Sequence, residues 1–118
     1  MNRAEASAKL GKNQDAIDDV NLIRTRAGLT GEKLYTVSNL KGRSSVFAVV
    51  LEERRIELMF EAQRRWDIFR NGLTLDRNYP GIHTSGKALL SIPATHPRVV
   101  FFIPESQMLV QSNLVQNP

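Results

Sequence analysis

The sequence contains no cysteine among its 118 residues. This absence excludes disulfide bonds, cysteine nucleophiles and thiolate metal sites, although it does not indicate a cellular compartment. No apolar stretch is long enough to cross a membrane, and residues 1–6 lack the apolar core of a signal peptide. The chain as it stands is therefore expected to be soluble.

Motifs for catalysis and metal binding are also scarce. The two histidines, His83 and His96, lie thirteen residues apart in loop-like sequence, with no HExxH pattern. No serine lies in a GxSxG setting, and no glycine-rich loop precedes a lysine as in a phosphate-binding site. Glu52 and Glu53 are adjacent, so on a helix they point about 100° apart and do not converge on one substrate. Catalytic residues, a metal site and a cofactor are not expected, and an enzyme is the least supported class.

The charge distribution argues against nucleic acid as a partner. The formal net charge is +4, but residues 44–72 carry five arginines and five acidic side chains. No stripe of basic residues is interleaved with aromatic residues, which make up 7% of the chain. Nucleic-acid binding is therefore not expected.

At 118 residues, the whole chain is long enough for one domain at most. Helical periodicity dominates its first part. Residues 1–28 predict a helix hairpin, with a break at residues 11–13, Asn13 as the cap of the second helix and Gly28 as its end. Alanines on the facing sides allow the two helices to approach closely. Residues 30–43 are expected to form a loop, and Ser44 or Ser45 then caps a long helix over residues 44–72.

The long helix is predicted to carry an apolar face and a charged face. Arg55 falls within the apolar face, so we expect it to be buried against carboxylates or carbonyls. The opposite face predicts an ion-pair network, although a solvated salt-bridge face explains most patterns of this kind. The residues of the apolar face are Leu51, Leu58, Met59, Ala62, Trp66 and Phe69; those of the charged face are Glu53, Arg54, Glu57, Glu61, Arg64 and Arg65. The expected pairs are Arg54 with Glu57, Glu61 with Arg64 and Glu61 with Arg65.

Residues 73–118 have a different character. Residues 73–86 show no sustained period and predict an irregular, exposed excursion. Residues 99–103 form a β-prone apolar run, after which Pro104 opens a short helical turn. The asparagine-rich tail is expected to dock on the helical body as a closing strap.

Four blocks, in this order, resemble the C-terminal part of the SusD/RagB family. They are Ala-Glu-Ala-x-Ala-Lys-Leu-Gly at residues 4–11, Asn-x-Ile-Arg-x-Arg-Ala-Gly-Leu at 21–29, Leu-x-Glu-Arg-Arg-x-Glu-Leu-x-Phe-Glu-x-x-Arg at 51–64, and Phe-Ile-Pro at 102–104 with Asn-Leu-x-Gln-Asn-Pro at 113–118. Ala62 stands where members often carry glycine, and Gln107 and Ser112 also depart from the common pattern. The resemblance covers nearly the whole chain but only the last portion of a typical member.

The resemblance implies an all-α fold of tetratricopeptide-like α/α helix pairs, with this chain as a fragment of a larger α-superhelical protein. It implies a non-catalytic lipoprotein on the outer surface of the outer membrane. Such proteins capture glycans, and in some branches peptides, for a TonB-dependent (SusC-like) transporter. The charged helix motif would then have a structural role.

Five residues are candidates for contact with a ligand. Trp66 and Tyr79 suit stacking on a sugar ring, and Arg77, Asn78 and His83 suit hydrogen bonds to hydroxyl groups. The position of Trp66 on the apolar face favours a core role instead, Tyr79 lies beside a proline-glycine turn, and His83 is equally consistent with a plain surface residue.

A different class of function stays open at this point. The chain is also compatible with a small helical-repeat adaptor that binds another protein in the groove between its helices. One helix pair and one long helix leave apolar faces uncovered, because repeat architectures need about three units for stability. As a fragment, the chain is therefore expected to self-associate or to expose apolar patches.

Overall fold

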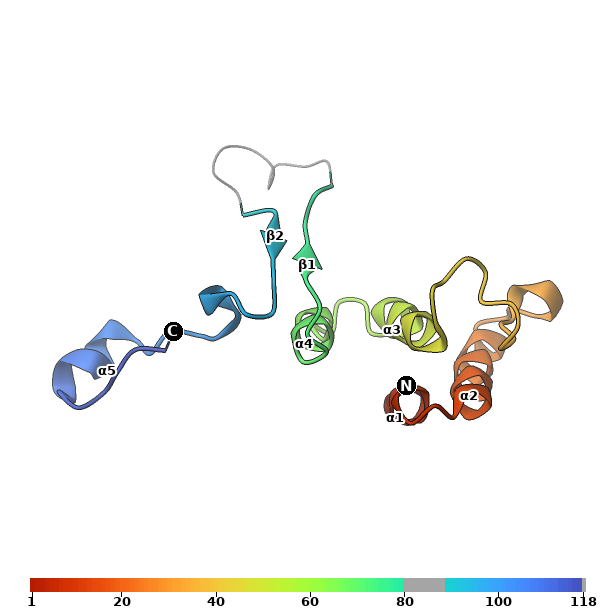
Figure 1. Cartoon of the computed structure of the whole chain (residues 1–118), viewed down its shortest axis with the longest axis horizontal. Helices are drawn as coiled ribbons and strands as arrows, with labels where there is room; N and C mark the ends of the chain where they lie inside the picture. The colour runs from red at the N-terminus through yellow and green to blue at the C-terminus, as the bar shows by residue number, and fades with distance from the viewer. Residues whose placement is uncertain (80–88, 118) are drawn as a thin grey trace. The chain divides into compact units, whose positions relative to one another are not determined.

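The computed structural model describes residues 1–79 and 89–117, which form two compact units. Figure 1 shows the order of their elements. Unit 1, residues 1–64, contains helices α1 (Asn2–Lys9), α2 (Asn13–Arg26) and α3 (Val46–Glu57) and the 3-10 helix η1 (Gly31–Lys33). Unit 2, residues 65–118, contains nearly all of α4 (Arg64–Phe69), strands β1 (Leu75–Asp76) and β2 (Ser91–Ile92), the 3-10 helix η3 (Pro97–Val99) and α5 (Glu105–Val110). Because helices make up most of the regular structure, the predicted all-α class is confirmed.

Helices α1 and α2 lie where the spacing predicted a hairpin, and both end in the same glycine motif. After α2, Gly28 has φ +82°, its N–H donates to the Thr25 carbonyl at 2.9 Å, and Leu29 N–H donates to the Arg24 carbonyl at 2.9 Å. This is the Schellman pattern, in which a left-handed residue satisfies the last carbonyls of a helix. Gly11, with φ +74°, closes α1 in the same way. Asn13 is the first residue of α2 rather than its cap, a position taken by Lys12.

The core of unit 1 lies where α1, α2 and α3 meet. Its fully buried side chains are small or β-branched, which allows the helices to approach closely. The loop before α3 is anchored by Asn21, whose side-chain amide forms two hydrogen bonds with the backbone of the buried Tyr35, at 2.8 and 2.9 Å. The core residues are Ala4, Ala16, Ile17, Val20, Tyr35, Val46, Val49 and Val50.

The predicted long helix over residues 44–72 is wrong, because the structure divides it into α3 and α4. Ser45 caps α3 as expected, since its hydroxyl accepts from Ala48 N–H at 3.1 Å. Between the helices, Phe60 and Ala62 have φ values of +72° and +57°. A left-handed residue turns the chain out of the α-helical path, so two of them prevent one continuous helix. No glycine or proline marks this turn in the sequence.

Unit 2 contains more regular secondary structure than the irregular excursion and strap predicted for residues 73–118. Strands β1 and β2 pair antiparallel, with Leu75 opposite Ile92, where the sequence predicted irregular structure. The β-prone run at residues 99–103 forms no strand. Instead, the side chain of Gln116 holds the Ile103 backbone, accepting from its N–H at 2.7 Å and donating to its carbonyl at 2.9 Å. Side-chain amides of the tail therefore replace a partner strand.

Candidate functional site

Buried arginine–carboxylate pairs connect α3 to the hairpin. Arg54 and Glu53 on α3 are each 5% exposed. Arg54 Nε lies 3.7 Å from a carboxylate oxygen of Glu5 on α1, and its Nη1 donates to Asn2 Oδ1 at 2.6 Å. Glu53 pairs with Arg24 of α2, which also donates to the Lys33 carbonyl at 2.7 Å. These pairs fix α3 against both helices of the hairpin.

The ion pairs predicted within the long helix are not the ones that form. Glu57 pairs with Arg26 of α2 rather than with Arg54. Glu61 lies in the turn between α3 and α4 and is exposed, so it does not share a helical face with Arg64 and Arg65. A pairing rule based on spacing within one helix fails where the helix ends and where a second helix offers arginines.

The prediction that Arg55 is buried is wrong. Its side chain is 52% exposed and donates to both carboxylate oxygens of Glu52, at 2.6 and 3.1 Å. The hydrogen bond from Arg55 lowers the pKa of Glu52, and the same bond raises the pKa of Arg55. Arg3 and Asp19 form a similar exposed pair, in which hydrogen bonding lowers the pKa of Asp19. The buried arginine is its neighbour Arg54, because α3 ends at Glu57 and packs on α1 by its charged side.

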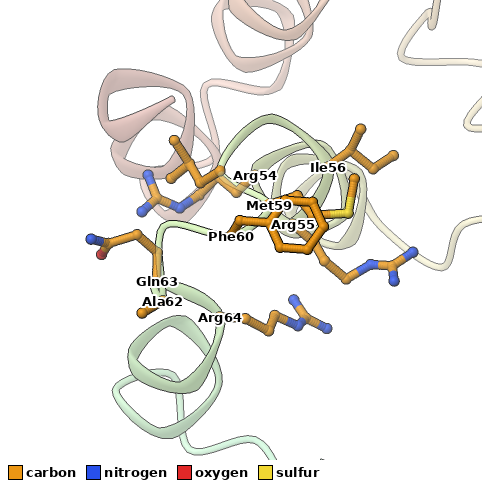
Figure 2. Close-up of a pocket in the computed structure, with 9 residues that line it drawn as sticks. Arg54, Arg55, Ile56, Met59, Phe60, Ala62, Gln63 and Arg64 are labelled. Carbon is orange, nitrogen blue, oxygen red and sulfur yellow. The ribbon is translucent and has the colours of Figure 1, made fainter.

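A pocket of about 580 Å³ lies at the turn between α3 and α4. Phe60 is 97% exposed, and its neighbours Met59 and Ile56 are 58% and 51% exposed. In the view of Figure 2, the guanidinium groups of Arg55 and Arg64 extend to one side of the turn, whereas Arg54 and Gln63 extend to the other. Apolar side chains with a few converging polar groups are typical of binding pockets. The lining residues are Arg54, Arg55, Ile56, Leu58, Met59, Phe60, Ala62, Gln63 and Arg64.

An aromatic cluster surrounds Arg65 in unit 2. The guanidinium lies 4.5 Å from the ring centre of Phe101 and 5.4 Å from that of Trp66, and it donates to the Val99 carbonyl at 2.8 Å. Trp66 and Phe101 meet edge to face with ring centres 6.4 Å apart. The expectation that Trp66 is a core residue is wrong for this chain, because its side chain is 50% exposed. The cation holds two exposed rings in a fixed arrangement, which leaves aromatic surface open to a ligand.

The remaining candidates for ligand contact lie at the end of β1. Arg77 N–H donates to the Leu90 carbonyl at 2.7 Å and extends the pairing of β1 with β2. Asn78 follows in a turn closed by its own N–H and the Asp76 carboxylate, at 2.8 Å, and Tyr79 is 57% exposed. His83 lies outside the described residues. Three of the five candidates are thus consecutive residues that follow β1 directly.

Several residues of these sites were not predicted from the sequence. Arg24 and Glu5 were seen only as parts of helix motifs, and their partners lie 29 and 49 positions further along the chain. Arg65 and Phe101 are brought together across 36 positions. Spacing within one element carries no signal for such contacts, although Val46 and Val50 lie on the charged side of the helix and, as apolar residues, need covering there.

Two classes of feature are missing from the described part of the chain. In residues 1–79 and 89–117, no group of three potential ligands among histidine, aspartate and glutamate is arranged to hold a metal ion. Within the same ranges, no helix has the length and hydropathy to cross a membrane.

The chain is similar to proteins of one family along its whole length. The model of the SusD family matches residues 1–118. A SusD-like protein of Formosa agariphila is 35% identical over 89 residues, covering 64% of this chain and 18% of that protein. A crystal structure of a candidate sugar-binding protein from Bacteroides vulgatus has a TM-score of 0.75 and 28% identity, covering 98% of this chain and 25% of that one. The chain thus spans no more than a quarter of the length of either relative.

Proposed function

Because the chain belongs to the SusD family, we propose that it is the C-terminal part of a surface protein that binds oligosaccharides. In this proposal the longer protein is lipid-anchored at the outer membrane and passes its ligand, chemically unchanged, to a TonB-dependent transporter. Unit 1 serves as scaffold, since its arginine–carboxylate pairs connect three helices.

The observation that carries this proposal is the exposed pair Trp66 and Phe101. The C–H groups of a sugar ring pack well on an aromatic face, and a ring already fixed in place loses little entropy when the sugar binds. Arg65 fixes both rings, with its guanidinium 5.4 Å from one and 4.5 Å from the other. The similarity to a protein described as a candidate sugar-binding protein supports the same class of ligand.

The end of β1 is a second place where a sugar is expected to bind. Tyr79 offers an exposed ring with a hydroxyl, and Arg77 and Asn78 offer hydrogen-bond donors beside it. A peptide would also use these groups, but the family of this chain and the sugar-binding description of its structural neighbour favour a sugar. Oligosaccharides are therefore the ligand class that we propose, with peptides as the alternative that the experiment distinguishes.

The test measures binding of a panel of oligosaccharides and peptides by calorimetry, using the protein expressed from its own open reading frame. Trp66→Ala is expected to weaken oligosaccharide binding by about 5- to 30-fold, because one stacked ring contributes on the order of 1–2 kcal/mol. The matched control is Phe102→Ala, which removes a ring that is 57% exposed but lies outside the cluster around Arg65. Equal loss in both variants, or binding of peptides alone, would contradict the proposal. Chromatography of the recovered sugar should show no chemical change.

Location and partner are tested on the native protein. Fractionation of source cells should place it in the outer membrane with a lipid at its N-terminus, and mild cross-linking should recover a β-barrel transporter with it. An unmodified protein of 13.3 kDa with neither property would favour the small helical adaptor instead.

A further inference from the structure

We infer that the pocket at the turn between α3 and α4 is the seat of another segment of the same longer protein. That segment, outside residues 1–118, places an apolar side chain beside Phe60 and an acidic side chain against Arg64. The inference rests on the proposal that the chain is part of a longer protein and not on its sugar binding.

The apolar surface of the pocket is the first argument. Phe60 is 97% exposed, while Met59 and Ile56 next to it are more than half exposed. Covering a side chain of this size stabilises a protein by about 1.5–3 kcal/mol. A group of three such side chains around a concave surface is typical of an interaction site rather than of free surface.

The backbone of the turn is the second argument. Phe60 and Ala62 adopt left-handed conformations, with φ values of +72° and +57°. Such conformations cost about 1–2 kcal/mol for each residue other than glycine, and they persist where surrounding contacts hold them. The Phe60 ring makes almost no such contact within the described residues, because nearly all of its surface is open. Backbone hydrogen bonds from Met59 N–H and Glu61 N–H hold the turn itself, and a segment from outside residues 1–118 would supply the missing contacts of the ring.

Charge identifies the occupant's polar group. Three arginines line the pocket and no acidic residue does. Arg54 pairs with Glu5 and Arg55 pairs with Glu52. Within the described residues Arg64 has no carboxylate at hydrogen-bond distance, and the acidic group that attracts it, Glu52, is already hydrogen-bonded to Arg55. A carboxylate from outside would satisfy its guanidinium with paired hydrogen bonds.

The same chemistry favours a protein segment over a sugar in this pocket. Sugar hydroxyl groups donate as well as accept hydrogen bonds, so sugar sites need acceptor side chains. Among the lining side chains, Gln63 alone offers an oxygen acceptor. The two relatives are much longer than this chain, because the matched part makes up 18% of one and 25% of the other. A longer protein of this kind contains further segments that could occupy the pocket.

Thiol labelling tests the inference in the protein expressed from its own open reading frame. The chain has no cysteine of its own between residues 1 and 118, so Ala62→Cys introduces one reporter in the pocket. Glu32→Cys, on the exposed helix η1, is the matched control. We expect the thiol at position 62 to be alkylated at least tenfold more slowly than the control thiol in the folded protein. In denaturant both thiols should react at the same rate.

A second substitution separates the inference from a general loss of folding. Arg64→Glu in the Ala62→Cys background should restore fast labelling at position 62, whereas Arg64→Lys should keep the protection. Equal labelling of both thiols in the folded protein would overturn the inference. So would protection that depends on protein concentration, which indicates a second copy, or on added oligosaccharide, which indicates a sugar site. Loss of sugar binding with protection intact would instead overturn only the proposed function.

Discussion

Replacing Glu5 by leucine tests whether the buried ion pair between α1 and α3 holds unit 1 together. Glu5 and Arg54 are 4% and 5% exposed, and their charged groups lie 3.7 Å apart. The substitution leaves the guanidinium of Arg54 buried without this carboxylate. Stranding a buried charge costs about 3–5 kcal/mol. We expect a loss near 3 kcal/mol, at the lower end of that range, because Arg54 keeps its hydrogen bond to Asn2.

The double variant Glu5→Leu/Arg54→Leu distinguishes desolvation from simple loss of contacts. Replacing both members of a buried pair by apolar side chains is often nearly neutral. We therefore expect the double variant to lie within about 1 kcal/mol of the parent, so the two single effects should not add. Urea denaturation followed by circular dichroism at 222 nm gives the free energy of unfolding for each protein.

Arg55→Leu is the matched control, because Arg55 is the exposed neighbour of Arg54 on the same helix. Its pair with Glu52 is accessible to water and should contribute less than about 1 kcal/mol. The reasoning fails if Arg55→Leu costs as much as Glu5→Leu, or if the double variant is less stable than either single variant.

Three further predictions concern acid stability, the α3 cap and the turn. The lowered pKa of Glu52 contributes stability above its usual pKa of 4.5 that is lost as the pH falls through the lowered value. In urea melts, Glu52→Gln should therefore lose less stability than the parent as the pH falls below 4.5, and an equal loss would argue against this reasoning. Ser45→Ala should cost about 1 kcal/mol, because it removes the cap of Ala48 N–H; Ser44→Ala, which removes no such bond, is its control. Ala62→Gly should gain up to about 1 kcal/mol at a positive φ, whereas Ala27→Gly, at φ −77°, should not; a destabilised Ala62→Gly protein in thermal melts would count against the turn geometry.

The hairpin shows how much of the fold is local. Gly11 and Gly28 end their helices because a left-handed residue is easiest for glycine, and the apolar spacing between them predicts which faces meet. Ser45 is placed as a cap by the same kind of argument. Each of these predictions depends on residues within about one helical turn, so the sequence pattern is sufficient.

The break between α3 and α4 shows where that reasoning fails. Residues 44–72 keep a helical pattern throughout, yet Phe60 and Ala62 leave the helix without a glycine or proline between them. The left-handed conformation at Ala62 is one that glycine adopts more easily than alanine. A single chain with alanine there hides the signal. The break in turn exposes Arg55, removes Glu61 from the charged face and opens the pocket.

For the candidate sugar contacts, the sequence identified suitable residue types, and the structure identified which residues lie next to them. Trp66 was recognised as a ring suited to stacking, but Arg65 and Phe101 join it only because residues 99–103 run past α4. The sequence by itself determined the helical class and the ends of the hairpin, since these depend on local spacing and capping, and its motifs carried the resemblance to one family. Tertiary structure alone decided which arginine is buried, which carboxylate it meets and which rings are exposed, since those outcomes depend on contacts between segments about 30 to 50 residues apart, where periodicity carries no information.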